Sequence, residues 1–123
     1  MHIKSAVLLS IVLSGSACAQ DKACLLEGSL TIGAQTTEIK DCLQNDGVPQ
    51  AQFVKTCTGL GEFAKATGGP SAKITYLAAC PAKSQASCIG LFGKPMTSYY
   101  YKRDAATLAD SKSSCKAQGG RWQ

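Results

Sequence analysis

The sequence predicts a small α+β domain stapled by disulfide bonds, with two helices on one face of an antiparallel sheet. Two observations support this fold class. Strand-like runs precede each of two segments with helical periodicity, which gives the element order ββαββα. An even set of cysteines is also spread over a chain of ordinary domain length. These cysteines, which follow an N-terminal leader, are Cys24, Cys42, Cys57, Cys80, Cys88 and Cys115.

Residues 1–19 have the composition of a bacterial secretion signal. A short positive start containing Lys4 precedes an apolar stretch over residues 6–13, and small residues follow up to Ala19. This stretch is shorter than the ~20 apolar residues that a stable membrane-spanning helix needs, and no later segment reaches that length. We therefore expect the leader to be removed and residues 20–123 to form a single disulfide-rich domain without a transmembrane span, either periplasmic or secreted.

Cys18 offers a second processing route. Cleavage before this residue would leave a cysteine that carries a lipid anchor, which would make the protein an outer-membrane lipoprotein. The flanking residues fit this route less well, because a bacterial lipobox has leucine three residues before the cysteine, where this chain has Gly15. On either route Cys18 takes no part in the disulfide framework.

Gly33 begins a two-residue turn between two strand-like runs, residues 24–32 and 35–42. Glycine at the first turn position suits a type II′ hairpin. The same register places Glu27 opposite Lys40, a favourable cross-strand pair. The sequence therefore predicts a hairpin at the start of the domain.

Two segments have helical periodicity. The first runs from Pro49, which suits the first turn of a helix, to about Thr67. The second runs over residues 105–118 and has Asp104 as its N-cap. In both helices a cysteine lies on the apolar stripe and should face inward. The apolar stripe of the first helix consists of Phe53, Cys57, Leu60 and Ala64.

Two further strand-like runs, residues 72–79 and 96–103, lie between the helices. The first has Ile74 between polar neighbours, and the second is rich in aromatic residues that favour strands. We expect these two runs to pair with each other.

Six cysteines in a small exported domain indicate three disulfide bonds rather than a metal site. An oxidising compartment favours disulfides, and the sequence has no Cys-x-x-Cys pair of the kind found in zinc sites. Six cysteines allow many connectivities. The element layout favours the pairs Cys24–Cys42, Cys57–Cys115 and Cys80–Cys88.

Several catalytic chemistries are excluded for the exported domain. The only histidine, His2, lies in the leader, so no histidine remains as an acid, a base or a metal ligand. Oxidised cysteines exclude thiol catalysis, and the glycines form neither a P-loop nor a dinucleotide fingerprint. A carboxylate pair of the glycosidase kind stays formally open, but no pair is distinguished by its sequence context. We expect a protein that is not an enzyme and has no cofactor.

The charge of the domain is mildly basic. Once Lys4 has left with the leader, twelve basic residues face eight acidic ones, and the lysines are spread along the chain. This distribution favours acidic partners or envelope polyanions and does not indicate nucleic-acid binding.

The nine residues Cys80–Cys88 form a loop that resembles the cystine-clamped loops of Bowman–Birk protease inhibitors. The likeness lies in the size of the ring and in the Lys83-Ser84 pair within it, and it implies that Lys83 enters a trypsin-like pocket. The lysine lies one place later than in that family, and no proline follows Ser84. The alternative interpretation is a disulfide-closed connection between two strands.

A second candidate surface lies on the aromatic run. Alternate residues of a strand share a face, so Tyr99, Tyr101 and Arg103 are expected to point the same way. Exposed tyrosines beside an arginine are typical of protein recognition surfaces. The alternative is that one face of this strand fills the core while the other caps the sheet.

These observations predict an exported, non-catalytic binding protein, of the inhibitor or immunity type, that neutralises an envelope-acting enzyme. The partner would be another protein of the cell envelope, and the residues expected to contact it are Tyr99, Tyr101, Arg103 and Lys83. The alternative is a structural or accessory envelope component of a transport or conjugation assembly, for which a lipid anchor at Cys18 is one option.

Overall fold

The computed structural model describes residues 21–66 and 69–123. The expected leader and the candidate lipid-anchor residue Cys18 lie outside the described residues. Two helices are described, α1 (Gln50–Ala66) and α2 (Ala105–Ala117), together with a short 3-10 helix, η1 (Leu91–Gly93). The described strands are β1 (Ala23–Ile32), β2 (Gln35–Asn45), β3 (Lys73–Leu77), β4 (Ala86–Ile89), β5 (Met96–Tyr100) and β6 (Arg121–Trp122).

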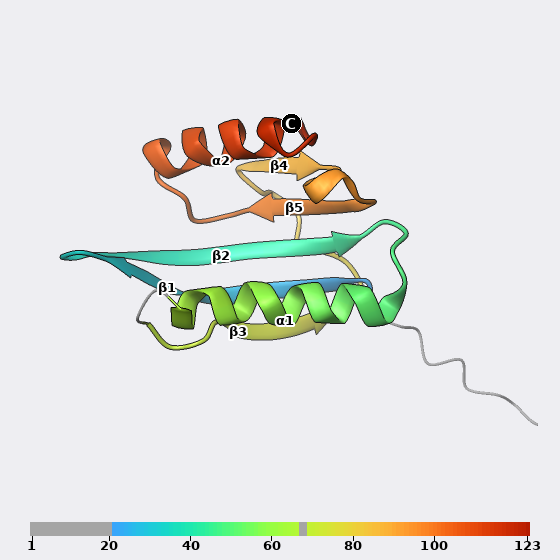
Figure 1. Cartoon of the computed structure of the whole chain (residues 1–123), viewed down its shortest axis with the longest axis horizontal. Coiled ribbons are helices and arrows are strands. Elements are labelled where there is room, and N and C mark those ends of the chain that lie inside the picture. Colours follow the sequence, from blue (N-terminus) through green and yellow to red (C-terminus); the bar gives the residue numbers. More distant parts are fainter. Residues whose placement is uncertain (1–20, 67–68) are drawn as a thin grey trace, which may run out of the picture.

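The strands pair antiparallel in one sheet, in the order β3-β1-β2-β5-β4-β6. Both helices lie on the same side of this sheet (Figure 1), which confirms the predicted α+β class. The structure also contains two short strands, β4 and β6, that the sequence analysis did not predict. Among the described residues, no helix is long and apolar enough to cross a membrane.

The strand register explains why the helices share a face. Cys24, Leu43, Ser98 and Cys88 are successive cross-strand partners from β1 to β4. Directly opposed residues of antiparallel strands point to the same side. Since Cys24 is bonded to α1 and Cys88 to α2, both helices attach to this side of the sheet.

The predicted β1–β2 hairpin is confirmed. Ile32 pairs with Gln35 across a two-residue turn, and Gly33 has φ of 63°, as the first position of a type II′ turn requires. Glu27 lies opposite Lys40, as the register predicted.

The expected pairing of residues 72–79 with residues 96–103 is wrong. β3 pairs with β1, whereas β5 pairs with β2 and β4. The β1–β2 hairpin has two outer edges, and β3 and β5 each pair with one of them. The partner of β5 on its other side is β4, a four-residue strand too short for its sequence pattern to reveal.

The number of disulfides matches the expectation, but the expected partners are wrong. Cys24 cannot reach Cys42, because their neighbours in the ladder place them on opposite faces of the sheet. Each helix is bonded to the sheet rather than to the other helix. The observed bonds are Cys24–Cys57, Cys42–Cys80 and Cys88–Cys115.

The predicted helix ends are confirmed to within one residue. In the first turn of α1, the Phe53 N–H donates to the Pro49 carbonyl at 3.0 Å. At the start of α2, the Thr107 N–H donates to Asp104 Oδ1 at 2.7 Å, and this bond lowers the pKa of Asp104 below its ordinary value. Gly119, with φ of 83°, ends α2 in the left-handed conformation that favours glycine.

The backbone after α2 passes directly over the Cys88–Cys115 bond at Gly120. A Cβ added there would lie 2.6 Å from the Cys88 Sγ and 2.8 Å from the Cys115 Sγ. Because the disulfide holds both sulfurs, Gly120→Ala is expected to lower the free energy of unfolding by about 1–3 kcal/mol. Urea unfolding under non-reducing conditions measures this change.

The matched control is Gly59→Ala in α1, where an added Cβ meets nothing within 4 Å. Alanine favours the helix over glycine, so this variant should gain roughly 1 kcal/mol. Equal effects of the two substitutions would contradict the close contact at Gly120.

Candidate functional site

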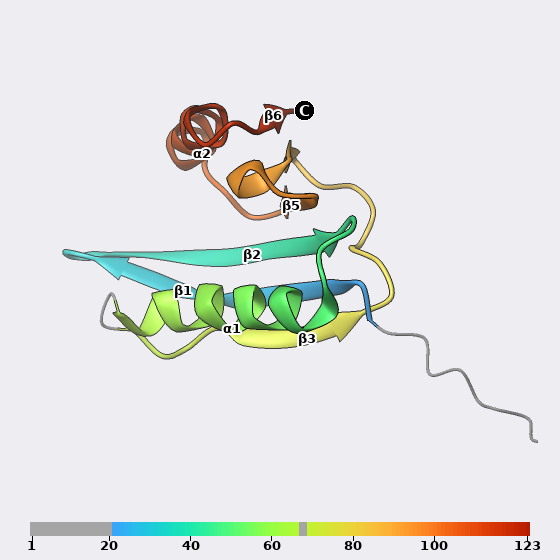
Figure 2. The ribbon, with the colours of Figure 1, turned by 45° about the vertical axis from the view of Figure 1, so that its right-hand side comes forward.

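The two helices pack near opposite edges of the sheet. α1 packs on β1 and β3 (Figure 1), while α2 packs beside β6 (Figure 2). Turning the molecule shows the same separation of the helices (Figure 2). A groove of about 570 Å³ lies between them. The sheet residues that line it are Leu26, Ile39, Asp41, Cys42, Leu43, Ser98 and Tyr100.

Disulfide bonds hold both walls of the groove in place. Cys57 attaches α1 to β1, and Cys115 attaches α2 to β4. These two cysteines are almost fully buried. A groove whose walls are covalently fixed loses little conformational entropy when it binds, which favours tight binding by a rigid surface.

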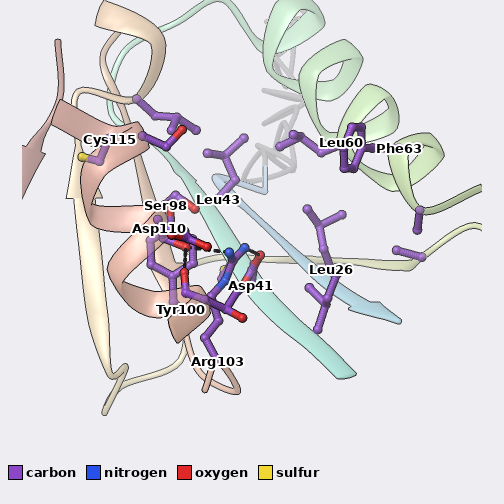
Figure 3. Close-up of a pocket in the computed structure, with 18 of the residues that line it drawn as sticks. Leu26, Asp41, Leu43, Leu60, Phe63, Ser98, Tyr100, Arg103, Asp110 and Cys115 are labelled. Carbon is purple, nitrogen blue, oxygen red and sulfur yellow. Dashed lines mark hydrogen bonds and ion pairs between the residues drawn. The ribbon is translucent and has the colours of Figure 1, made fainter. Parts of the chain in front are cut away.

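The two walls differ in chemistry. α1 contributes the apolar side chains Leu60, Phe63 and Ala64, whereas α2 contributes polar ones that include Asp110 and Ser111. Figure 3 shows Leu60 and Phe63 on one side and Asp110 on the other, with Leu43 between them. Phe63 is 61% exposed, although large apolar side chains are usually buried. The groove is therefore amphipathic across its width.

Phe92 of η1 adds a second exposed aromatic ring to the groove. Its φ is 58°, a left-handed conformation that costs a bulky residue roughly 1–3 kcal/mol. Gly90 and Gly93 on either side are also left-handed. The result is a phenylalanine side chain that is 45% exposed. Phe92 therefore adds exposed apolar surface to the groove.

An ion pair joins the floor of the groove to the α2 wall. Arg103 contacts the Asp41 carboxylate through its Nη2 at 2.5 Å and its Nε at 3.4 Å. Its Nη1 donates to Ser111 Oγ at 2.7 Å, and the guanidinium lies 4.5 Å from the centre of the Tyr100 ring. Burial raises the pKa of Asp41 above its ordinary value, although the bond and the charge of Arg103 oppose this shift.

The expectation that Tyr99, Tyr101 and Arg103 share a face is wrong. β5 ends at Tyr100, so the alternation of a strand does not continue to Arg103. Tyr99 lies opposite Cys42, on the face away from the helices. Arg103 instead turns to the helix face and pairs with Asp41. The sequence signal for Asp41 was weak, because only its register opposite Tyr100 places it in the groove.

The Cys80–Cys88 loop is not a cystine-clamped ring, so its likeness to an inhibitor loop does not hold. Its first cysteine is bonded to Cys42 on the face away from the helices, and its last is bonded to α2. Tyr101 donates its hydroxyl to the Pro81 carbonyl at 2.5 Å and helps to hold this loop. Lys83 is exposed, with φ of 66°. The loop is a crossover connection from β3 to β4.

The charged residues lining the groove are Asp41, Arg103 and Asp110. Within residues 21–66 and 69–123, no cluster of three histidine, cysteine or acidic residues is placed to hold a metal ion. The six bonded cysteines carry no free thiol. The arrangement thus offers contact area and a few polar groups, which is the usual composition of a binding groove.

Comparison with known proteins does not assign a family to this chain. No protein-family model, curated protein or solved structure matches it.

Replacing Arg103 tests the electrostatics of the groove. Arg103→Gln removes the bond and the positive charge that lower the pKa of Asp41, while burial continues to raise it. The pKa of Asp41 should rise further, as measured by NMR titration of its carboxyl carbon. Lys102→Gln is the control, because Lys102 pairs with the exposed Glu38 and should leave Asp41 unchanged.

The same shift has a consequence for stability. The folded-state pKa of Asp41 lies above 3.8, so the folded protein binds this proton more tightly than the unfolded chain. The stability that Asp41 contributes is fully present below the unfolded pKa and is lost as pH rises through the folded pKa. Arg103→Gln should enlarge this loss in urea unfolding across the acidic range. A smaller loss in the variant would contradict the assignment.

Proposed function

We propose that this protein is an exported, non-catalytic binding protein that takes an apolar segment of another protein into the groove between α1 and α2. The observation that carries the proposal is the pair of exposed rings, Phe63 and Phe92, which line the groove between the two helices. Exposed apolar patches of this kind mark interaction sites. Aromatic residues at such sites supply much of the binding energy.

The partner in this proposal is an enzyme that acts in the cell envelope, and binding neutralises it. Three disulfides fit an oxidising compartment, as the leader sequence also suggests. A rigid scaffold with fixed walls is suited to inhibition, since little freedom is lost on binding. The alternative is a structural or accessory component of an envelope assembly, for which a lipid anchor at Cys18 is one option.

The test is capture from a bacterial envelope extract by the oxidised protein, followed by an activity assay on the captured enzyme. The double variant Phe63→Ser/Phe92→Asn removes both rings, and asparagine tolerates the left-handed backbone at position 92. We expect capture and inhibition to fall at least tenfold, roughly the effect of removing a binding hot spot. Val54→Ser is the matched control, because Val54 is an exposed apolar residue of α1 that does not line the groove.

A second variant, Tyr99→Ser/Tyr101→Ser, tests the other face of the sheet. If this variant loses the partner and the groove variant keeps it, the partner binds the face away from the helices and the groove proposal is wrong. Capture of a multi-protein assembly without inhibition of any enzyme would favour the accessory role. Mass spectrometry of the mature N-terminus would then show whether Cys18 carries a lipid.

A further inference from the structure

We infer, on the basis of the proposed function, that the partner's segment binds in extended form and adds a strand to the free edge of β2 at residues 35–39. The added strand would lie next to Ile39, the groove-lining residue of β2 that is nearest the hairpin turn. The inference rests on the backbone groups of this edge, on its lack of protection against strand addition and on its place beside the groove.

β5 covers only part of the edge of β2. The two strands pair over residues 41–45 of β2, and the last bond on this side runs from the Tyr101 N–H to the Lys40 carbonyl at 3.0 Å. Figure 1 shows β2 reaching well beyond the end of β5. Among the residues that the structure describes, the only strand paired with residues 35–39 is β1. Their other edge is open.

The free backbone groups belong to alternate residues of this edge. Because the Lys40 carbonyl points towards β5, the N–H and C=O groups of Glu38 and Thr36 point to the same side. Those of Thr37 and Ile39 point towards β1, within the hairpin. An extended segment can pair with the free groups as a strand does. A helix bonds its backbone internally and would leave them without partners.

This edge lacks the features with which proteins usually prevent strand addition. Such features include proline, bulges and charged side chains on the edge strand. Residues 35–39 contain no proline, and their register with β1 has no bulge. Their single charge, on Glu38, is compensated by Lys102 at 3.3 Å. Threonine and isoleucine, which favour strands, make up most of the segment. The edge is therefore ready to accept another strand.

The side chains of the edge predict the pattern of the added strand. Ile39 lies on the same face of β2 as Leu43, the face that carries the helices, whereas Glu38 points to the other face. Ile39 is half-buried and lines the groove together with the exposed Phe63. A residue of the partner placed opposite Ile39 should therefore be apolar, and its neighbours should be polar. The segment that binds alternates apolar and polar residues.

The experiment is a phage-display selection from a library of short linear peptides of random sequence, with the oxidised protein as bait. We expect enrichment of peptides in which apolar and polar residues alternate. Glu38→Pro removes an N–H of the free edge and should block the new ladder, whereas Glu38→Gln keeps this N–H and is the matched control. Calorimetry on a selected peptide should show affinity weakened about tenfold by Glu38→Pro and less than about twofold by Glu38→Gln.

Hydrogen exchange of the native protein gives a second readout that needs no variant. The selected peptide should slow exchange of the Thr36 and Glu38 amides, because it takes up their free N–H groups. The amides of Thr37 and Ile39 already face β1 and should change little. This alternation distinguishes an added strand from a helix or a lipid in the groove, which would leave the Thr36 and Glu38 amides unpaired.

Three outcomes would overturn the inference. The native bait enriches no peptide above the Glu38→Pro bait, or a selected peptide binds without slowing exchange at Thr36 and Glu38. In the third, the protein dimerises in sedimentation and Glu38→Pro abolishes the dimer, which would make a second copy the occupant of the edge.

The envelope capture separates this inference from the proposed function. If the Phe63→Ser/Phe92→Asn variant loses the enzyme and Glu38→Pro keeps it, strand addition is rejected and the proposed function stands. The reverse result would support the free edge of β2 as the binding site and reject the groove.

Discussion

The register of the β1–β2 hairpin is the constraint on which the other elements depend. Because side chains alternate along a strand, it places Cys24 on the helix face and Cys42 on the opposite face. The first cysteine then holds α1, and the second holds the crossover loop after β3. A shift of one residue between β1 and β2 would place both cysteines on the same face, so that only one of the two attachments could form. The groove lies between the helices because they are bonded to β1 and β4, which lie on either side of β2 and β5 in the sheet.

The groove combines a rigid frame with features that cost stability. A left-handed phenylalanine and a partly buried ion pair are both unfavourable in isolation. The bonds from Arg103 to Asp41 and Ser111 offset part of this cost by joining β2 to α2. The two faces of the sheet also differ. One face carries the helices and the groove, and the other is crossed by the loop that Tyr101 and the Cys42–Cys80 bond hold down.

Much of the fold could be predicted because its signals are local. A glycine turn between strand-like runs fixed the hairpin and its Glu27–Lys40 pair, and Asp104 marked the start of α2. The candidate site could not be predicted in the same way. Arg103 was expected beside Tyr99, but β5 ends before it, and the chain turns Arg103 towards Asp41, a residue far away in sequence. Phe92 lies in a short 3-10 turn whose left-handed backbone has no clear signature in the residue types.

The sequence by itself determined the α+β class, the hairpin, both helices and the participation of six cysteines in bonds. It could do so because turn chemistry, side-chain periodicity and helix capping act between residues that are near one another in the chain. Only the tertiary structure decided which cysteines pair, which edge each later strand takes and which side chains meet in the groove. These choices depend on contacts between distant segments, whose geometry is set by the sheet as a whole.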